Sequence, residues 1–98
     1  MSKKVPSYIE LTEDHAIITL TKPSEMNGVK VDKVTLRAPT VREMRISSKT
    51  AGGDEEQIEL NLFASLAEVG IQDLDNLTIK NYNRISTGYT FLVREDEL

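Results

Sequence analysis

The chain of 98 residues lacks cysteine and tryptophan and contains a single histidine, His15. Without cysteine, a disulfide scaffold, a thiolate zinc site and a cysteine nucleophile are all excluded. The apolar runs are a few residues long, far below the roughly 20 residues that a membrane-spanning helix needs. No apolar segment of the secretory type follows the basic start of the chain. We therefore expect no membrane contact and a reducing cytoplasmic compartment.

Groups that could carry catalysis are also sparse. His15 falls in a predicted strand, where its acidic neighbours Glu13 and Asp14 cannot both share its face, because adjacent strand residues point to opposite sides. The segment Ala51-Gly-Gly-Asp54 lacks the Gly-Lys-Ser/Thr of a phosphate-binding loop. Asp73-Leu-Asp75 lacks the Gly and the closing Glu of a calcium loop. We predict no enzyme activity, no cofactor and no metal site.

Charge is unevenly distributed along the chain. The net charge is −4, which argues against a general nucleic-acid binder. Residues 1–50 contain nine basic and six acidic side chains, whereas residues 51–98 contain three basic and ten acidic ones. Such asymmetry can steer a protein towards an oppositely charged partner or towards a second copy of itself. The alternative is an unevenly charged surface that is simply solvated.

The first half of the chain predicts a β-hairpin over residues 15–37. A β-branched run begins at His15, and Asn27-Gly28 is a typical hairpin turn. Val29 to Leu36 form a second extended segment that stops before Pro39, and the change of parity between Val31 and Val34 suggests a bulge. Residues 1–14 are predicted to form an N-terminal arm or a frayed strand.

The second half predicts about three helices, over residues 41–48, 55–69 and 79–93. Thr40-Val-Arg-Glu43 has the form of a capping box, Asp54 and Thr78 are suitable N-caps, and Gly70 suits the position after a helix. Gly88 is a weak point that costs about 1 kcal/mol if it lies inside a helix. The sequence therefore predicts a single small α+β domain over residues 15–98, preceded by the arm.

The predicted helix 55–69 is apolar over more than half of its circumference. One stripe contains Leu62 and Leu66, which we assign to the core. The additional apolar surface of this helix either packs between the hairpin and the last helix or forms a face that binds a helical partner. On the second interpretation, the predicted partner-binding residues are Leu60, Phe63 and Phe91.

Several motifs resemble a known family. They are Ile18-Thr-Leu-Thr-Lys-Pro23, Gly28, Leu36-Arg-Ala-Pro-Thr-Val-Arg-Glu-Met44, Glu59-Leu-Asn-Leu-Phe-Ala-Ser-Leu66, Gly70-Ile, Asp73-Leu and Ile79-Lys-Asn-Tyr82. Over about residues 17–91 the chain resembles Mu-like phage tail assembly chaperones of the tail protein E type. It departs from them at Asn81, where an acidic residue of an Asp-Tyr pair is expected.

This resemblance implies a small non-enzymatic protein of the host bacterial cytoplasm. Such chaperones bind the tape-measure protein during tail assembly, are absent from the mature virion, and are often also made in a longer, frameshifted form. The tail-tube protein is a second candidate partner. Two other classes stay open. One is a small phage regulator associated with nucleic acid, which the cluster of Arg37, Arg42 and Arg45 would favour. The other is a minor structural tail protein.

Overall fold

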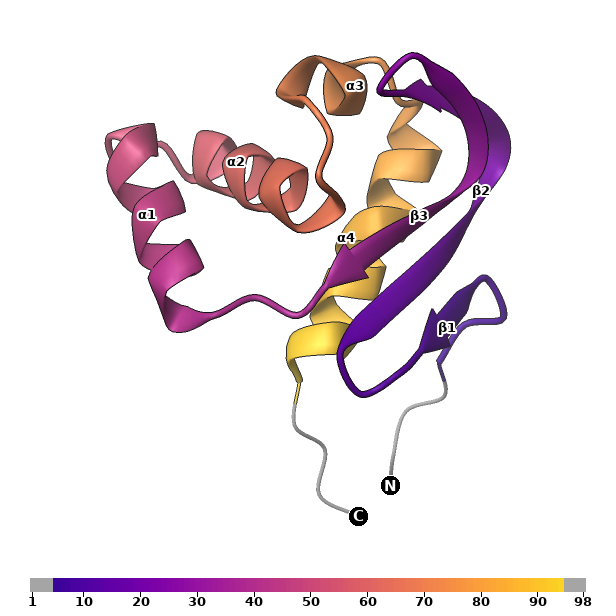
Figure 1. Ribbon diagram of the computed structural model, residues 1–98, viewed down its shortest axis with the longest axis horizontal. Helices are drawn as coiled ribbons and strands as arrows, with labels where there is room; N and C mark the ends of the chain where they lie inside the picture. Colours follow the sequence, from indigo (N-terminus) through magenta and orange to yellow (C-terminus); the bar gives the residue numbers. More distant parts are fainter. Residues whose placement is uncertain (1–4, 95–98) are drawn as a thin grey trace.

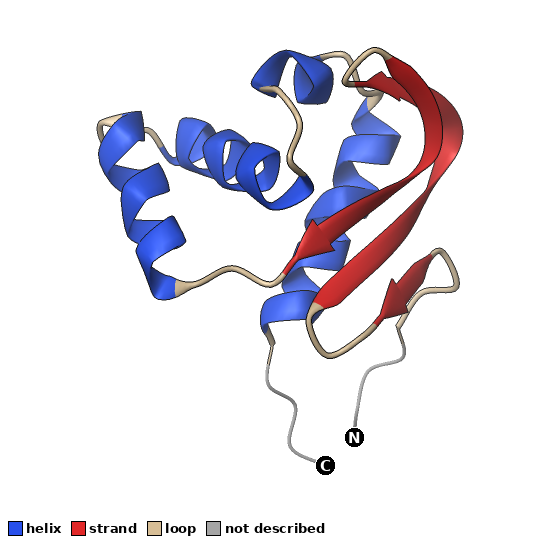
Figure 2. Ribbon diagram, viewed as in Figure 1, coloured by secondary structure: helices blue, strands red, loops and turns tan. Residues whose placement is uncertain are grey.

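A computed structural model describes the protein over residues 5–94. Within these residues an antiparallel sheet, in the order β1-β2-β3, is followed by four helices (Figures 1 and 2). The strands are β1 (Ile9–Leu11), β2 (His15–Met26) and β3 (Val29–Arg37). The helices are α1 (Val41–Ala51), α2 (Glu55–Ala67), α3 (Ile71–Asp75) and α4 (Ile79–Val93). The predicted α+β class is confirmed.

The hairpin of β2 and β3 turns at Asn27 and Gly28, as predicted. Both residues have positive φ angles, 55° and 79°, the combination that matches the twist of the flanking strands in a two-residue turn. Of the two alternatives predicted for the N-terminal segment, an arm or a frayed strand, residues 9–11 follow the second: they form β1 and pair with β2 through Ile9 opposite Ile18. The buried side chain of Ile9 explains why this short strand stays on the sheet.

A bulge interrupts the hairpin, but the additional residues lie in β2 rather than in β3. Thr19 pairs with Lys33 and Ser24 pairs with Val31, so the segment 20–23 faces a single residue of β3. The valine parity located the irregularity correctly along β3, and the pairing shows that β2 carries the extra residues. The bulge leaves backbone groups of Thr21 and Lys22 without ladder partners, and a side chain of α4 binds them.

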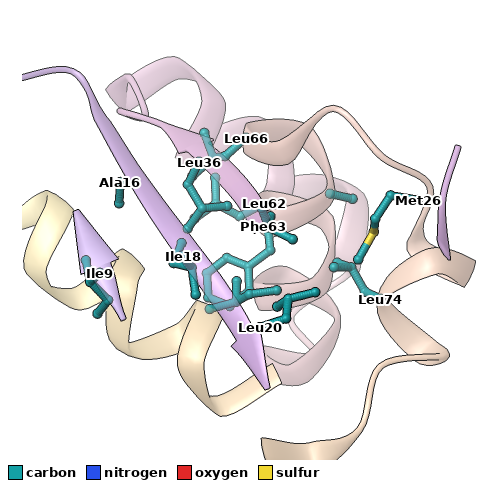
Figure 3. Packing of buried hydrophobic residues seen from close by; sticks show 13 residues of the cluster. Ile9, Ala16, Ile18, Leu20, Met26, Leu36, Leu62, Phe63, Leu66 and Leu74 are labelled. Carbon is teal, nitrogen blue, oxygen red and sulfur yellow. The ribbon is translucent and has the colours of Figure 1, made fainter. Parts of the chain in front are cut away.

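The hydrophobic core lies between one face of the sheet and the helices (Figure 3). Ala16, Ile18 and Leu20 alternate along β2 and are buried, as expected for a sheet with one covered face. Leu62 and Leu66 of α2 are also buried, which confirms their predicted core position. The radius of gyration is 13.3 Å, close to the value of about 13 Å expected for a domain of this length.

Gly88 lies inside α4 and allows this helix to approach β2 closely. A Cβ atom at this position would be 2.7 Å from Cγ1 and 2.8 Å from Cδ1 of Ile18. Because Ile18 is fully buried, its side chain has no free space to move into. The glycine that weakens the helix locally is therefore the residue that lets the helix pack on the sheet.

The end of α2 differs from the prediction at two points. The helix stops at Ala67, and Glu68 adopts the left-handed conformation with a φ of 58°, whereas Gly70, the predicted residue for this role, has a φ of −78°. The segment after Gly70 contains a single helical turn, α3. Asp73 of α3 accepts hydrogen bonds from the amides of Gly70 and of Asn27, which ties α3 to the hairpin turn.

Candidate partner-binding surface

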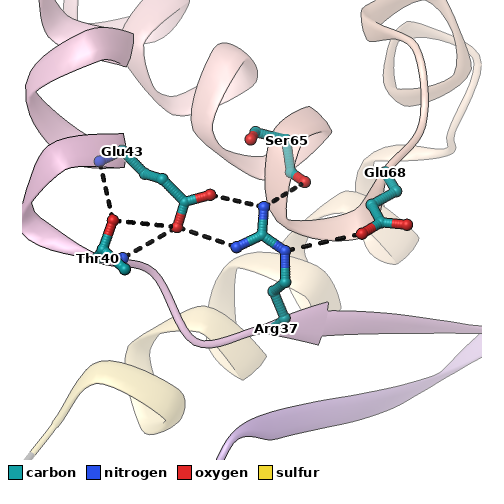
Figure 4. A network of polar contacts seen from close by, with 5 residues as sticks. All are labelled: Arg37, Thr40, Glu43, Ser65 and Glu68. Atoms are coloured by element: carbon teal, nitrogen blue, oxygen red, sulfur yellow. Dashed lines mark hydrogen bonds and ion pairs between the residues drawn. The ribbon is translucent and has the colours of Figure 1, made fainter.

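Arg37, at the end of β3, holds the start of α1 and the end of α2 together (Figure 4). Its guanidinium contacts both carboxylate oxygens of Glu43, at 3.0 and 2.6 Å, and donates to the carbonyl oxygen of Ser65 at 3.3 Å. The carboxylate of Glu68 lies 3.8 Å from Nε. Thr40 and Glu43 complete the predicted capping box of α1. These contacts fix the direction in which α1 leaves the sheet.

The same contacts make the stability of the fold depend on Glu43 at low pH. The hydrogen bond from Arg37 and that from the Thr40 amide lower the pKa of Glu43 from 4.5 to about 2. A lowered pKa in the folded state stabilises the fold above about pH 4.5, and this contribution is lost as the pH falls towards 2.

We expect Glu43→Gln to lower the free energy of unfolding at pH 7 by about 1 kcal/mol, since Arg37 is partly exposed and solvent screens the pair. Urea denaturation of both proteins between pH 7 and pH 2 measures this difference. It should shrink steadily below about pH 4.5. A difference that stays constant over this range would show that the Glu43 carboxylate does not stabilise the folded state.

Helix α1 stands at the edge of the molecule and packs mainly against α2 (Figure 1). Its one buried residue is Ser47. The opposite side of the helix presents cations to solvent, flanked by exposed apolar side chains. We call this surface the α1 outer face; it comprises Arg42, Met44, Arg45, Ile46, Ser48 and Lys49 around a hollow of about 690 Å³. None of the ion pairs among residues 5–94 involves Arg42, Arg45 or Lys49.

An apolar groove separates α1 from the end of α4. This α1–α4 groove has a volume of about 570 Å³, and its lining residues are Ala38, Pro39, Thr40, Val41, Met44, Arg45, Tyr89, Leu92 and Val93. Val41 is 78% exposed and Val93 is 48% exposed. Exposed apolar side chains that gather around a concave surface are typical of an interaction site.

A second groove, with acidic walls, lies between the starts of α2 and α4. This α2–α4 groove has a volume of about 580 Å³, and its lining residues are Glu55, Glu56, Glu59, Leu60, Leu74, Asp75, Leu77, Ile79 and Tyr82. Tyr82 donates a hydrogen bond of 2.8 Å to Glu59, and burial together with this bond raises the pKa of Tyr82. The phenol therefore stays protonated and holds the carboxylate of Glu59 in place.

The structure does not bring the three predicted partner-binding residues together. Phe63 is 1% exposed and packs against the rings of Tyr82 and Tyr89, at centroid distances of 5.8 and 5.2 Å. The predicted surface position of Phe63 is therefore wrong, because α4 covers this side of α2. Leu60 is half-buried and lines the α2–α4 groove.

Phe91 is half-buried, with the Arg94 guanidinium 4.3 Å above its ring. It follows Tyr89 by two helical positions, which places it about 200° away around α4. Contact of Leu60 and Phe91 with a partner stays a prediction.

Sequence reasoning missed the exposed apolar residues of α1 and of the end of α4. Val41 and Met44 of α1 both line the α1–α4 groove. These two side chains are exposed because α1 is held away from the sheet. Arg37 holds it there through contacts with residues up to 31 positions further along the chain. One sequence feature could have predicted this exposure: the side of α1 opposite Val41 has few apolar residues, so the helix has little apolar surface to bury on that side.

The remaining chemistry of the described part of the chain is limited. His15 lies at the exposed start of β2. Residues 5–94 contain no group of three or more histidine and carboxylate side chains arranged to hold a metal ion. No helix within this range combines the length and the apolar character needed to cross a membrane.

Comparison with known proteins identifies the family. The family model described as "Phage tail assembly chaperone proteins, E, or 41 or 14" matches residues 17–94. Comparisons with curated proteins and with solved structures give no significant match. The matched region starts in β2 and extends through α4, so it includes both grooves and the Arg37 contacts. The chain therefore belongs to the family of phage tail assembly chaperone proteins.

Proposed function

We propose that this protein binds the tape-measure protein in the host cytoplasm and keeps it soluble until the tail tube has formed around it. The main support is the α1–α4 groove, an exposed apolar surface beside a basic helix face. An amphipathic helix can place its apolar side in such a groove. The arginines next to the groove favour a helix with acidic residues along its flanks.

The proposal requires that the groove binds the partner and that the rest of the surface does not. We expect Val41→Glu combined with Val93→Glu to weaken binding of the tape-measure protein at least tenfold, about 1.4 kcal/mol, since both changes put charge into an apolar contact. Glu at position 41 is compatible with the first turn of α1, where the helix dipole favours negative charge. The measurement is co-purification from cells that express both proteins, followed by titration of a purified tape-measure fragment.

Val29→Glu is the matched control. Val29 is also exposed and apolar but lies at the hairpin turn, outside both grooves, so this variant should bind normally. Circular dichroism should show that all the variants are folded. Equal binding by the groove variant and the control would contradict the proposed site. Mass spectrometry of purified virions tests the related expectation that the protein is absent from the mature particle.

The tail-tube protein remains a second candidate partner, and the same co-purification with that protein tests it. A nucleic-acid-associated role has less support, because the cations of the α1 outer face alternate with exposed Met44 and Ile46. Phosphate contacts dominate the affinity of nucleic-acid-binding proteins, and exposed apolar side chains make no such contacts. Salt-dependent binding of duplex DNA or of RNA by the purified protein would favour that alternative.

A further inference from the structure

The α1 outer face and the α2–α4 groove are complementary in charge and both contain exposed apolar side chains. On the first surface, Arg42, Arg45 and Lys49 are accompanied by Ile46, which is 56% exposed. On the second surface, apolar side chains line the groove together with four carboxylates, those of Glu55, Glu56, Glu59 and Asp75. One of the apolar residues, Ile79, is 79% exposed. One molecule therefore has both halves of a mixed apolar and ionic contact.

The geometry of α1 suits it to be the inserted element. The helix has 11 residues, a length of about 16 Å. Arg42, Arg45 and Lys49 follow one another at spacings of three and four residues, so they form a single stripe along the helix. Such a stripe can meet a row of carboxylates with the apolar residues packed beside it.

The groove offers a prepared acceptor for this stripe. The hydrogen bond from Tyr82 holds the carboxylate of Glu59, which reduces the side-chain entropy lost when a cation binds there. Glu55 and Glu56 remain exposed in the first turn of α2. A guanidinium that meets a positioned carboxylate forms a charge-assisted hydrogen bond, stronger than a neutral one.

The two surfaces cannot meet within one molecule. Ser47, the buried residue of α1, lies two positions from both Arg45 and Lys49, which puts each of them about 160° away from Ser47 around the helix. Since α1 packs on α2 through the side of Ser47, its cations point away from the α2 helix of the same chain. The partner of each surface must come from another molecule.

We propose that the α1 outer face of one copy docks into the α2–α4 groove of a second copy. This inference does not require tape-measure binding, although Met44 and Arg45 belong both to the α1 outer face and to the α1–α4 groove. The contact is head-to-tail, so a pair of copies retains one free face of each kind, and association continues until a ring closes or a filament forms. Ionic contacts on exposed surfaces are screened by salt, so the association should weaken as the ionic strength rises.

Two variants of the full chain separate the faces. Arg45→Ser with Ile46→Ser removes one cation and one apolar side chain from the α1 outer face. Glu56→Gln with Ile79→Ser removes one anion and one apolar side chain from the α2–α4 groove. All four residues have exposed side chains, so the fold should persist. Val29→Ser with Lys30→Ser is the matched control for the first variant, because it also removes one cation and one apolar side chain, but at the hairpin turn.

Sedimentation velocity at rising protein concentration, in low and in high salt, measures the association. We expect the unmodified protein and the control to form oligomers in low salt, and each face variant alone to lose most of this association. An equimolar mixture of the two face variants should form a 1:1 dimer that grows no further, since it contains one intact pair of faces. This result is specific to a head-to-tail contact.

Three outcomes would overturn the proposal. The first is an unmodified protein that stays monomeric in low salt at all concentrations. The second is the loss of association in only one of the two variants, which indicates a symmetric contact of one face with itself. The third is a mixture of the variants that remains monomeric, which shows that the two faces do not bind each other.

Discussion

Phe63→Ala should unfold the domain or leave it only marginally stable, with a loss of about 3–5 kcal/mol in the free energy of unfolding. Phe63 is among the largest fully buried side chains, and its ring contacts Tyr82 and Tyr89 of α4. Truncation leaves a cavity at the point where α2, α4 and the sheet meet (Figure 3). Because native domains are stable by only about 5–15 kcal/mol, the expected loss is a large part of the total.

Urea denaturation followed by far-ultraviolet circular dichroism measures this loss. Phe91→Ala is the matched control: the same change at a half-buried ring should cost less, because less of the side chain is removed from contact with the core. A Phe63→Ala protein as stable as the unmodified one would mean that the ring lies at the surface. In that case, the ring of Phe63 would be available to bind a partner.

Asn81→Ala should lower the free energy of unfolding by about 2–3 kcal/mol, because backbone and side-chain groups of the β2 bulge lose their partners. The side chain of Asn81 is 1% exposed. Its Oδ1 accepts hydrogen bonds from the amide and the hydroxyl of Thr21, at 2.7 and 2.8 Å, and its Nδ2 donates to the carbonyl oxygen of Lys22 at 3.1 Å. One amide side chain thus satisfies three polar groups of the bulge.

The variant Asn81→Asp separates the accepted bonds from the donated one. It keeps both bonds from Thr21 but places a second carboxylate oxygen near the carbonyl oxygen of Lys22. Burial and this repulsion raise the pKa of the new carboxyl group. Its protonated form can still donate to Lys22, so the destabilisation relative to the unmodified protein should increase as the pH rises through that pKa.

Denaturation of the three proteins over a pH series tests both expectations, and Asn83→Ala, an exposed change on α4, should have an effect within about 0.5 kcal/mol. If Asn81→Ala is as mild as Asn83→Ala, water replaces the amide and the bulge does not depend on it. The contacts also give Asn81 a structural role at the position where the sequence departs from the acidic residue expected by resemblance.

The local features of this fold could be predicted because their partners are close in sequence. The Thr40 capping box, the Asp54 and Thr78 caps and the Asn27-Gly28 turn all involve groups within about four residues of each other. The energy of such contacts depends little on the rest of the chain. The family, too, could be recognised from motifs in their order along the sequence, and the match over residues 17–94 confirms it.

The features that were predicted wrongly, or not predicted at all, depend on packing between segments that are distant in sequence. The amino-acid pattern shows that α2 has more apolar surface than one contact requires, but the cover of Phe63 by α4 becomes visible only in the folded chain. In the sequence, Gly88 is only a residue that destabilises the helix. Its role in the close packing of α4 on the sheet depends on Ile18, which lies 70 positions earlier in the chain. The exposure of Val41 and Met44 likewise follows from the Arg37 contacts that hold α1 against α2. Periodicity determines which side chains share a face of an element, but which face is covered depends on the free energy of the whole packed chain.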